Sequence, residues 1–246
     1  MTTIPIPGRN HSIMKRKPKS GLWARIRRVC LKLGLFVFLF TLCQVAALKY
    51  IRPVVTPNVA WEWIESVYKK DRTKRPVYVY KKIEDISPHL QKAVLAAEDQ
   101  RFASHSGFDF NEISNAVREL IRHKRLRGAS TISMQTARSV FWISSRSLAR
   151  KIIEIYYTVL IELMWDKQRI LEIYLNTVDW GTGITGAEAA AQKYFSTRAA
   201  DLNASQAALL AAVLPNPHRL SPVRPSRYVQ KRQHQIMADM KKMPLL

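Results

Sequence analysis

The sequence predicts an all-α fold preceded by one membrane-spanning helix. Three observations support this. The run from Val29 to Leu48 is apolar except for Lys32. Farther along the chain, apolar residues recur at intervals of three and four, the period of an α-helix. Residues that cap helices, such as Ser87 and Asp166, stand directly before these segments. With 246 residues, the chain has the length of one ordinary domain and an appendage.

The amino-terminal segment has the pattern of a membrane anchor. The run 29–48 is long enough, at about 1.5 Å per residue, to cross a hydrocarbon layer of about 30 Å. Residues 1–48 carry nine Lys or Arg and no acid, and most of them lie in the basic tail 1–28. This asymmetry predicts a cytoplasmic amino terminus. The alternative is a cleaved secretory signal with Ala46 and Ala47 as processing residues, but the long apolar run favours a retained helix. Both alternatives export the domain.

The whole chain is strongly basic, with 40 Lys or Arg against 18 Asp or Glu and a formal net charge of +22. Such a charge favours anionic partners. Cys30 and Cys43 both lie in the apolar run. The exported part therefore has no cysteine, which excludes a disulfide framework and a thiol nucleophile there.

Residues 49–85 are the predicted juxtamembrane connector, and residues 86–246 are the predicted folded domain. The connector contains several prolines, Trp61 and Trp63. Its basic cluster consists of Lys69, Lys70, Arg72, Lys74 and Arg75. Aromatic and basic side chains favour the membrane–water interface, so the connector is expected to lie near the lipid surface. The alternative is a solvated linker with a short strand at 77–80.

Two adjacent carboxylates close the first predicted helix of the domain. Ser87 and Pro88 begin this helix, and its apolar residues place Glu98 at the border of a buried stripe. Asp99 points about 100° away around the axis, so the two carboxylates are expected to meet different surroundings. In the last turn the helix dipole disfavours anions and raises a carboxylate pKa, which suits a general base. The alternative is a solvated acidic pair at a frayed helix end.

A predicted helix at 111–121 and a basic turn lead into a second polar segment, residues 128–138. Ser130, Thr131 and Ser133 bring hydroxyls and backbone amides to a helix start. Such an arrangement can bind a diphosphate or sugar hydroxyls. The alternative is an ordinary N-cap, because Ser and Thr cap helices throughout proteins.

The next predicted helix, residues 146–165, carries two cations one turn before a carboxylate. Arg150 and Lys151 precede Glu154 by four and three residues. Because the helix is apolar on several sides, these charges are expected to be partly enclosed and to suit a diphosphate. The alternative is a set of surface ion pairs.

Four further helices complete the predicted domain. One of them is alanine-rich and follows a glycine turn within residues 181–195. The capping residues of the other three are Asp166, Asn203 with Gln206, and Ser226. The last helix is rich in Lys and Arg.

Five segments between Ile86 and Leu214 resemble, in order, the motifs of glycosyltransferase family 51, the peptidoglycan polymerases, and the chain is most similar to the monofunctional members. The matching residues are Glu98, Asp99, Phe102, His105 and Gly107; Ser130, Thr131 and Gln135; Arg150, Lys151 and Glu154; Glu172, Tyr174 and Asn176; and the segment 181–195. Two residues depart from the pattern. Met134 stands where the family has Gln, and Arg138 where it has Lys.

The resemblance implies a lysozyme-like domain on the outer face of the cytoplasmic membrane. This domain would polymerise lipid II into β-1,4-linked glycan strands by an inverting transfer that releases undecaprenyl pyrophosphate. The implied catalytic residues are Glu98, as the base, and Glu154. Arg138, Arg150 and Lys151 would stabilise the departing diphosphate. The other implied substrate contacts are Asp99, Phe102, His105, Gly107, Ser130, Thr131, Gln135, Glu172 and Asn176.

The expected partners are lipid II, the growing glycan strand, membrane lipids and other cell-wall synthesis proteins, but no nucleic acid. A bound Mg²⁺ or Mn²⁺ follows from the family alone, because no residues here have dedicated metal-ligand spacing. Two alternatives stay open: a membrane-anchored muramidase or lytic transglycosylase, and a non-catalytic basic protein that binds envelope polymers. Ser-x-x-Lys occurs at 12–15 and 66–69, but no Lys-Thr-Gly exists, which argues against a transpeptidase domain.

Overall fold

The computed structural model describes residues 20–53, 55–69, 77–124, 128–141 and 147–246. They divide into two compact units, one up to Gln44 and one from Val45 onward. The basic tail as far as residue 19 lies outside the described residues. So does the connector's basic cluster, apart from Lys69.

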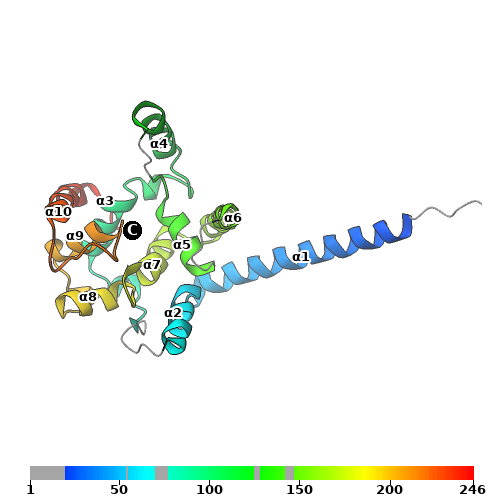
Figure 1. Cartoon of the computed structure of the whole chain (residues 1–246), viewed down its shortest axis with the longest axis horizontal. Coiled ribbons are helices and arrows are strands. Elements are labelled where there is room, and N and C mark those ends of the chain that lie inside the picture. The colour runs from blue at the N-terminus through cyan, green and yellow to red at the C-terminus, as the bar shows by residue number, and fades with distance from the viewer. Residues whose placement is uncertain (1–19, 54, 70–76, 125–127, 142–146) are drawn as a thin grey trace, which may run out of the picture. The chain divides into compact units, whose positions relative to one another are not determined.

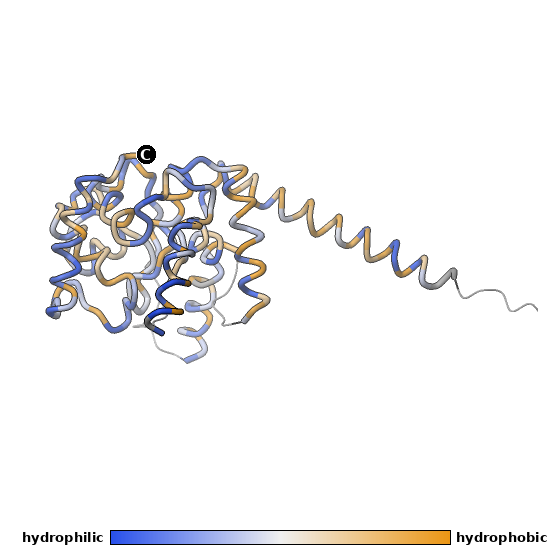
Figure 2. The backbone as a smooth tube through the Cα atoms, turned by 90° about the horizontal axis from the view of Figure 1, so that it is seen from above, coloured by the Kyte–Doolittle hydropathy of each residue, from blue (hydrophilic) through white to orange (hydrophobic). Residues whose placement is uncertain are grey.

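Helix α1, Ser20–Tyr50, contains the predicted membrane span. Its part Trp23–Tyr50 is long and apolar enough to cross a membrane, and Figure 2 shows the hydrophobic run along it. The helix begins at Ser20, upstream of Val29, the predicted start of the span, and it includes Arg25, Arg27 and Arg28. Long basic side chains are compatible with such an extension, since they can reach water from a helix end.

The second unit is mainly helical, which confirms the predicted all-α class. Its helices are α2 (Pro57–Tyr68), α3 (Pro88–Glu98), α4 (Phe110–His123), α5 (Ile132–Phe141), α6 (Leu148–Met164), α7 (Lys167–Thr177), α8 (Ala187–Phe195), α9 (Ala204–Val213) and α10 (Arg227–Asp239). Short 3₁₀ turns are η2 (Ile83–Asp85), η3 (Phe102–Ser104), η4 (Ala199–Asp201) and η5 (Met240–Lys242).

A three-stranded sheet, in the order β1-β3-β2, is the part of the fold that the sequence showed least. The strands are β1 (Val77–Tyr78), β2 (Asp179–Gly181) and β3 (Ile184–Thr185). β1 runs parallel to β3, and β2 runs antiparallel to it. The alternative strand at 77–80 corresponds to β1. β2 and β3 were not predicted, because two or three residues are too few to show the alternation of a strand.

Hydrogen bonds at the helix starts confirm the predicted caps. Ser87, Asp166 and Ser226 each accept a backbone N–H of the helix that follows. Asn203 and Gln206 form the reciprocal capping box. Each bond joins residues at most three positions apart, which is why the sequence alone could predict them.

Two groups of helices build the core (Figure 1). In one, α9 packs against α3 and α10; in the other, α5 packs against α6 and α7. Alanines such as Ala207, Ala208 and Ala211 are fully buried in α9 and allow neighbouring helices to approach closely. The predicted functional segments come from both groups, with Glu98 at the end of α3 and Gln135 on α5.

Candidate active site

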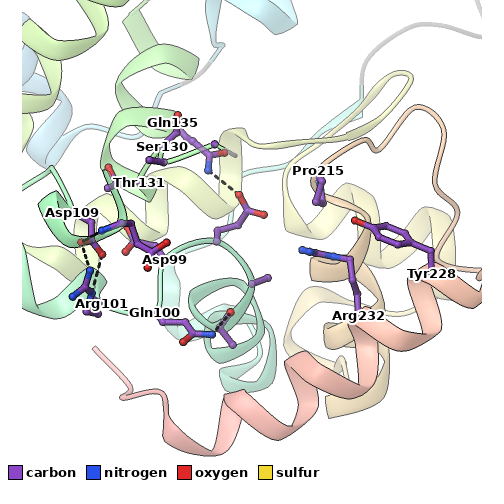
Figure 3. Close-up of a pocket in the computed structure, with 16 residues that line it drawn as sticks. Asp99, Gln100, Arg101, Asp109, Ser130, Thr131, Gln135, Pro215, Tyr228 and Arg232 are labelled. Carbon is purple, nitrogen blue, oxygen red and sulfur yellow. Dashed lines mark hydrogen bonds and ion pairs between the residues drawn. The ribbon is translucent and has the colours of Figure 1, made fainter. Parts of the chain in front are cut away.

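An open cavity of about 760 Å³ lies at the carboxyl end of α3 (Figure 3). It is lined by residues 96–101, Asp109, Glu112, residues 128–131, Gln135, Pro215, Tyr228 and Arg232. In the close-up, Ser130, Thr131 and Gln135 lie on one side and Pro215, Tyr228 and Arg232 on the other. The cavity therefore lies between segments from both helical groups.

Glu98 is held in this cavity by a short relay of side chains. Nε2 of Gln135 donates to Oε2 of Glu98 over 2.9 Å. The hydroxyl of the buried Tyr174 donates to Oε1 of Gln135 over 3.4 Å, which supports the orientation of the amide. Oε1 of Glu98 accepts no hydrogen bond from any described residue. One carboxylate oxygen is thus fixed, and the other stays available to a ligand.

Burial raises the pKa of Glu98 above its usual value, and the nearby charge of Asp99 raises it further. The Gln135 hydrogen bond and the charges of Arg232 and Arg138 act in the opposite direction without cancelling the rise. The predicted direction is confirmed, but its main cause is burial rather than the helix dipole.

Asp99 meets different surroundings, as predicted. Its side chain is buried, and Nε2 of His105 lies 2.9 Å from Oδ1. Oδ2 accepts the backbone N–H of Ile132 over 3.0 Å. Asp99 therefore ties the end of α3 to the turn after η3 and to the start of α5. We interpret Asp99 and His105 as holding Glu98 and Gln135 in register.

Three other residues of the first two motifs help to hold the segments around Glu98 and Asp99 in place through packing and hydrogen bonds inside the protein. Phe102 is buried, with Nζ of Lys167 4.5 Å from the centre of its ring. Gly107 has φ +88°, and a Cβ there would lie 2.9 Å from Thr158 Cγ2. Thr131 donates to the Gly107 carbonyl over 2.6 Å and also caps α5. The N-cap interpretation is therefore right for Thr131, although this residue also lines the cavity.

Met134, which replaces the expected Gln, is buried at 5% exposure. Its neighbour Ser133 is fully buried and bonds to Glu162 on α6. The side chain at position 134 is therefore part of the core of this chain rather than of the cavity lining.

Arg150, Lys151 and Glu154 form a compact ion cluster at the start of α6. Nη1 of Arg150 and Nζ of Lys151 each lie 2.6 Å from a different oxygen of Glu154. The Glu154 side chain is only 1% exposed, which contradicts the interpretation as ordinary surface ion pairs. None of the three lines the cavity. Arg138, on α5, is close enough for its charge to lower the pKa of Glu98.

Glu172 and Asn176 do not reach the cavity, in contrast to the predicted substrate contacts. Glu172 accepts the Tyr80 hydroxyl over 2.5 Å and the N–H of Ile83 over 2.8 Å, and it pairs with Arg169. Asn176 bonds to both backbone groups of Lys81 over 2.7 Å. We interpret both residues as fastening the segment 80–83 onto α7, since their polar groups are occupied inside the protein.

Several cavity residues were missed by the sequence argument. Arg101 forms a bidentate ion pair with Asp109 at the rim. Tyr228 and Arg232 come from the last helix, outside the five motifs. Their spacing of four residues places them on one face of α10, and this signal was available in the basic helix.

The donor set does not fit a preformed divalent-metal site. Among the described residues, no three His, Cys, Asp or Glu are grouped so that they could hold a metal ion. The oxygens of Asp99 are already used by His105 and Ile132. Mg²⁺ and Mn²⁺ require several free oxygen ligands.

Comparisons with known proteins agree on one family. The family model described as transglycosylase matches residues 64–241. A biosynthetic peptidoglycan transglycosylase of Bacteroides thetaiotaomicron is 45% identical over 221 residues, covering 89% of this chain and 88% of that protein. Proteins of the same description are 45% identical in Shewanella oneidensis (86% and 90% covered) and 47% identical in Aeromonas hydrophila (85% and 88% covered). The matched residues include the whole cavity.

Proposed function

Since the chain belongs to the transglycosylase family, we propose that the cavity is its active site and that Glu98 is the general base. The protein is a peptidoglycan glycosyltransferase, which polymerises lipid II into glycan strands in bacterial cell-wall synthesis. The observation that carries the proposal is the position of Glu98, whose partly buried carboxylate is held at one oxygen by Gln135 within an open cavity.

Glu98 takes the proton from the 4-hydroxyl of lipid II while that oxygen attacks the sugar carbon that carries the undecaprenyl diphosphate. A new C–O bond forms, and the bond to the diphosphate breaks. Attack opposite to the leaving group inverts this carbon and makes a β-1,4 linkage. The raised pKa supports this role, because a base is most effective when its pKa is close to the working pH.

The diphosphate leaves as an anion. Stabilising its negative charge therefore matters more than protonating the leaving oxygen. We propose that Arg138, Arg150 and Lys151 supply this stabilisation. Glu154 holds two of these cations and is a positioning residue in this scheme.

The decisive experiment incubates the purified full-length protein with labelled lipid II in detergent. Long glycan chains and undecaprenyl pyrophosphate are the expected products. Shortened or anhydro sugars from added peptidoglycan would instead show a muramidase or lytic enzyme. Salt-sensitive binding without any product would show a basic envelope-binding protein.

The pH dependence of polymerisation is expected to report on Glu98. Only the ionised carboxylate accepts a proton, so kcat/KM should fall as the pH drops through the raised Glu98 pKa. Gln135→Leu removes a hydrogen bond that lowers this pKa, so the acid midpoint should move to higher pH. Gln100→Leu is the matched control, because Gln100 lines the same cavity but bonds to Ala96 and Asp239. A Gln135→Leu midpoint that stays in place or moves down would contradict this assignment.

We also propose that α1 is retained as a single-pass anchor with the amino terminus in the cytoplasm and the catalytic unit outside. In spheroplasts, a tag before Met1 is expected to resist added protease and a tag after Leu246 to be cleaved, because the basic flank precedes the span. Reversed cleavage would refute the orientation. Contacts with other cell-wall synthesis proteins stay a prediction.

A further inference from the structure

Of the two cations that line the cavity, Arg101 is already paired with Asp109, and the mechanism above gives no substrate contact to the other, Arg232. It lies on α10, and its side chain enters the cavity on the side opposite to Ser130 and Gln135 (Figure 3). Its Nε donates to the carbonyl oxygen of Ala212 on α9 over 3.3 Å. This bond helps to fix the plane of the guanidinium group. Within the described part of the chain, the two terminal nitrogens have no hydrogen-bond or ion-pair partner.

The other cations of this region differ from Arg232: Arg138 does not line the cavity, and carboxylates already hold Arg101, Arg150 and Lys151. An arginine keeps its charge at any ordinary pH and presents its terminal N–H groups as a planar fork that matches the oxygens of a phosphate. Arg232 therefore offers the cavity an unused oxyanion-binding group.

Two further observations support a ligand at this place. Tyr228 lies one turn before Arg232 and lines the same wall, so its hydroxyl can add a neutral donor beside the cation. The charge of Arg232 also reaches the base, since it lowers the pKa of Glu98. A phosphate bound by Arg232 would thus lie within the electrostatic range of the reacting groups.

We propose that Arg232, together with the Tyr228 hydroxyl, forms a phosphate-binding site on α10 that holds a diphosphate of the lipid-linked substrate. This inference rests on the proposed function, which brings two such groups to the cavity. The donor carries a diphosphate that leaves, and the acceptor lipid II carries one that stays. The donor and acceptor diphosphates have the same chemistry, and steady-state kinetics can distinguish which of them Arg232 binds.

The test replaces Arg232 with Gln in the full-length enzyme and measures polymerisation of lipid II. Removing a charge-assisted hydrogen bond to a phosphate is expected to lower kcat/KM roughly 10- to 100-fold. A site for the donor diphosphate predicts a lower kcat and weaker inhibition by added undecaprenyl pyrophosphate. A site for the acceptor diphosphate predicts a higher KM for lipid II, with kcat and this inhibition unchanged. Arg232→Lys should fall between Gln and the parent, because it keeps the charge without the fork.

Lys231→Gln is the matched control, because Lys231 is the exposed neighbour and its replacement changes the net charge equally. Removing Arg232 should also weaken the salt dependence of kcat/KM, which a purely structural loss would leave in place. Parent kinetics and parent salt dependence in Arg232→Gln would overturn the inference, even with the proposed function intact. A parent enzyme that makes no polymer would instead overturn the proposed function. If Arg232→Gln does not fold, Arg232→Lys and Tyr228→Phe decide the question through the same measurements.

Discussion

Replacing Glu98 with Gln is expected to lower glycan polymerisation by roughly 10²- to 10⁴-fold, the usual contribution of a general base. The amide cannot accept a proton from the attacking hydroxyl at any working pH. Its carbonyl oxygen can still accept the hydrogen bond from Gln135, so the relay that holds position 98 should persist. Lipid II binding should stay close to that of the parent, because Glu98 is not needed to hold the diphosphate.

This experiment needs single-turnover rates and a separate binding measurement with lipid II. Glu84→Gln serves as the control, since that carboxylate is exposed and lies outside the cavity. It should match the parent in both measurements. A Glu98→Gln protein that is folded, bound to the membrane and nearly as fast as the parent would show that another group is the base.

Replacing Arg150 with Ala is expected to impair both substrate binding and turnover, so its phenotype should differ in kind from that of Glu98→Gln. Arg150 is proposed to make a charge-assisted hydrogen bond to a diphosphate that gains charge as the sugar bond breaks, so its removal should lower kcat/KM roughly 10- to 100-fold. Both binding and turnover should weaken, because the diphosphate is present in the ground state and in the transition state. Arg150→Lys should recover part of the activity.

The same substitution has a predicted cost in stability. Glu154 is buried and would keep only Lys151 as a counterion. The free energy of unfolding should therefore fall by about 1–3 kcal/mol. Urea unfolding measures this cost separately from the kinetics. Arg227→Ala, at an exposed position outside the cavity, should change neither quantity. Kinetic loss without weaker lipid II binding would indicate that Arg150 acts through Glu154 alone.

The local sequence could predict the helices because their determinants are short-range. Ser87, Asp166 and Ser226 each cap a helix through a bond to a residue at most three positions away. The apolar run 29–48 can likewise be recognised within one continuous stretch of the sequence. The pairing of Arg150 and Lys151 with Glu154 follows from one helical turn, and the raised pKa of Glu98 was predicted in direction.

The sequence could not separate cavity residues from structural ones within a motif. Glu172 and Glu98 both match the family pattern, yet Glu172 is bonded to the segment 80–83 while Glu98 lines the cavity. Met134 departs from the family pattern within a segment that matches a substrate-binding motif, and its side chain is buried in the core. In each case the role depends on which neighbouring helix covers the side chain.

The sequence by itself determined the all-α class, the apolar helix of membrane-spanning length and the capped helix starts, and it pointed to Glu98 as the proposed base. These features depend on residue type and on contacts within about one helical turn. Only the tertiary structure decided the far wall of the cavity. Packing of α9 against both α3 and α10 brings Arg232 into the same cavity as Glu98, although the two are distant in the chain. That packing depends on how the buried surfaces of three helices fit together, and a pattern within one stretch of sequence does not specify this fit.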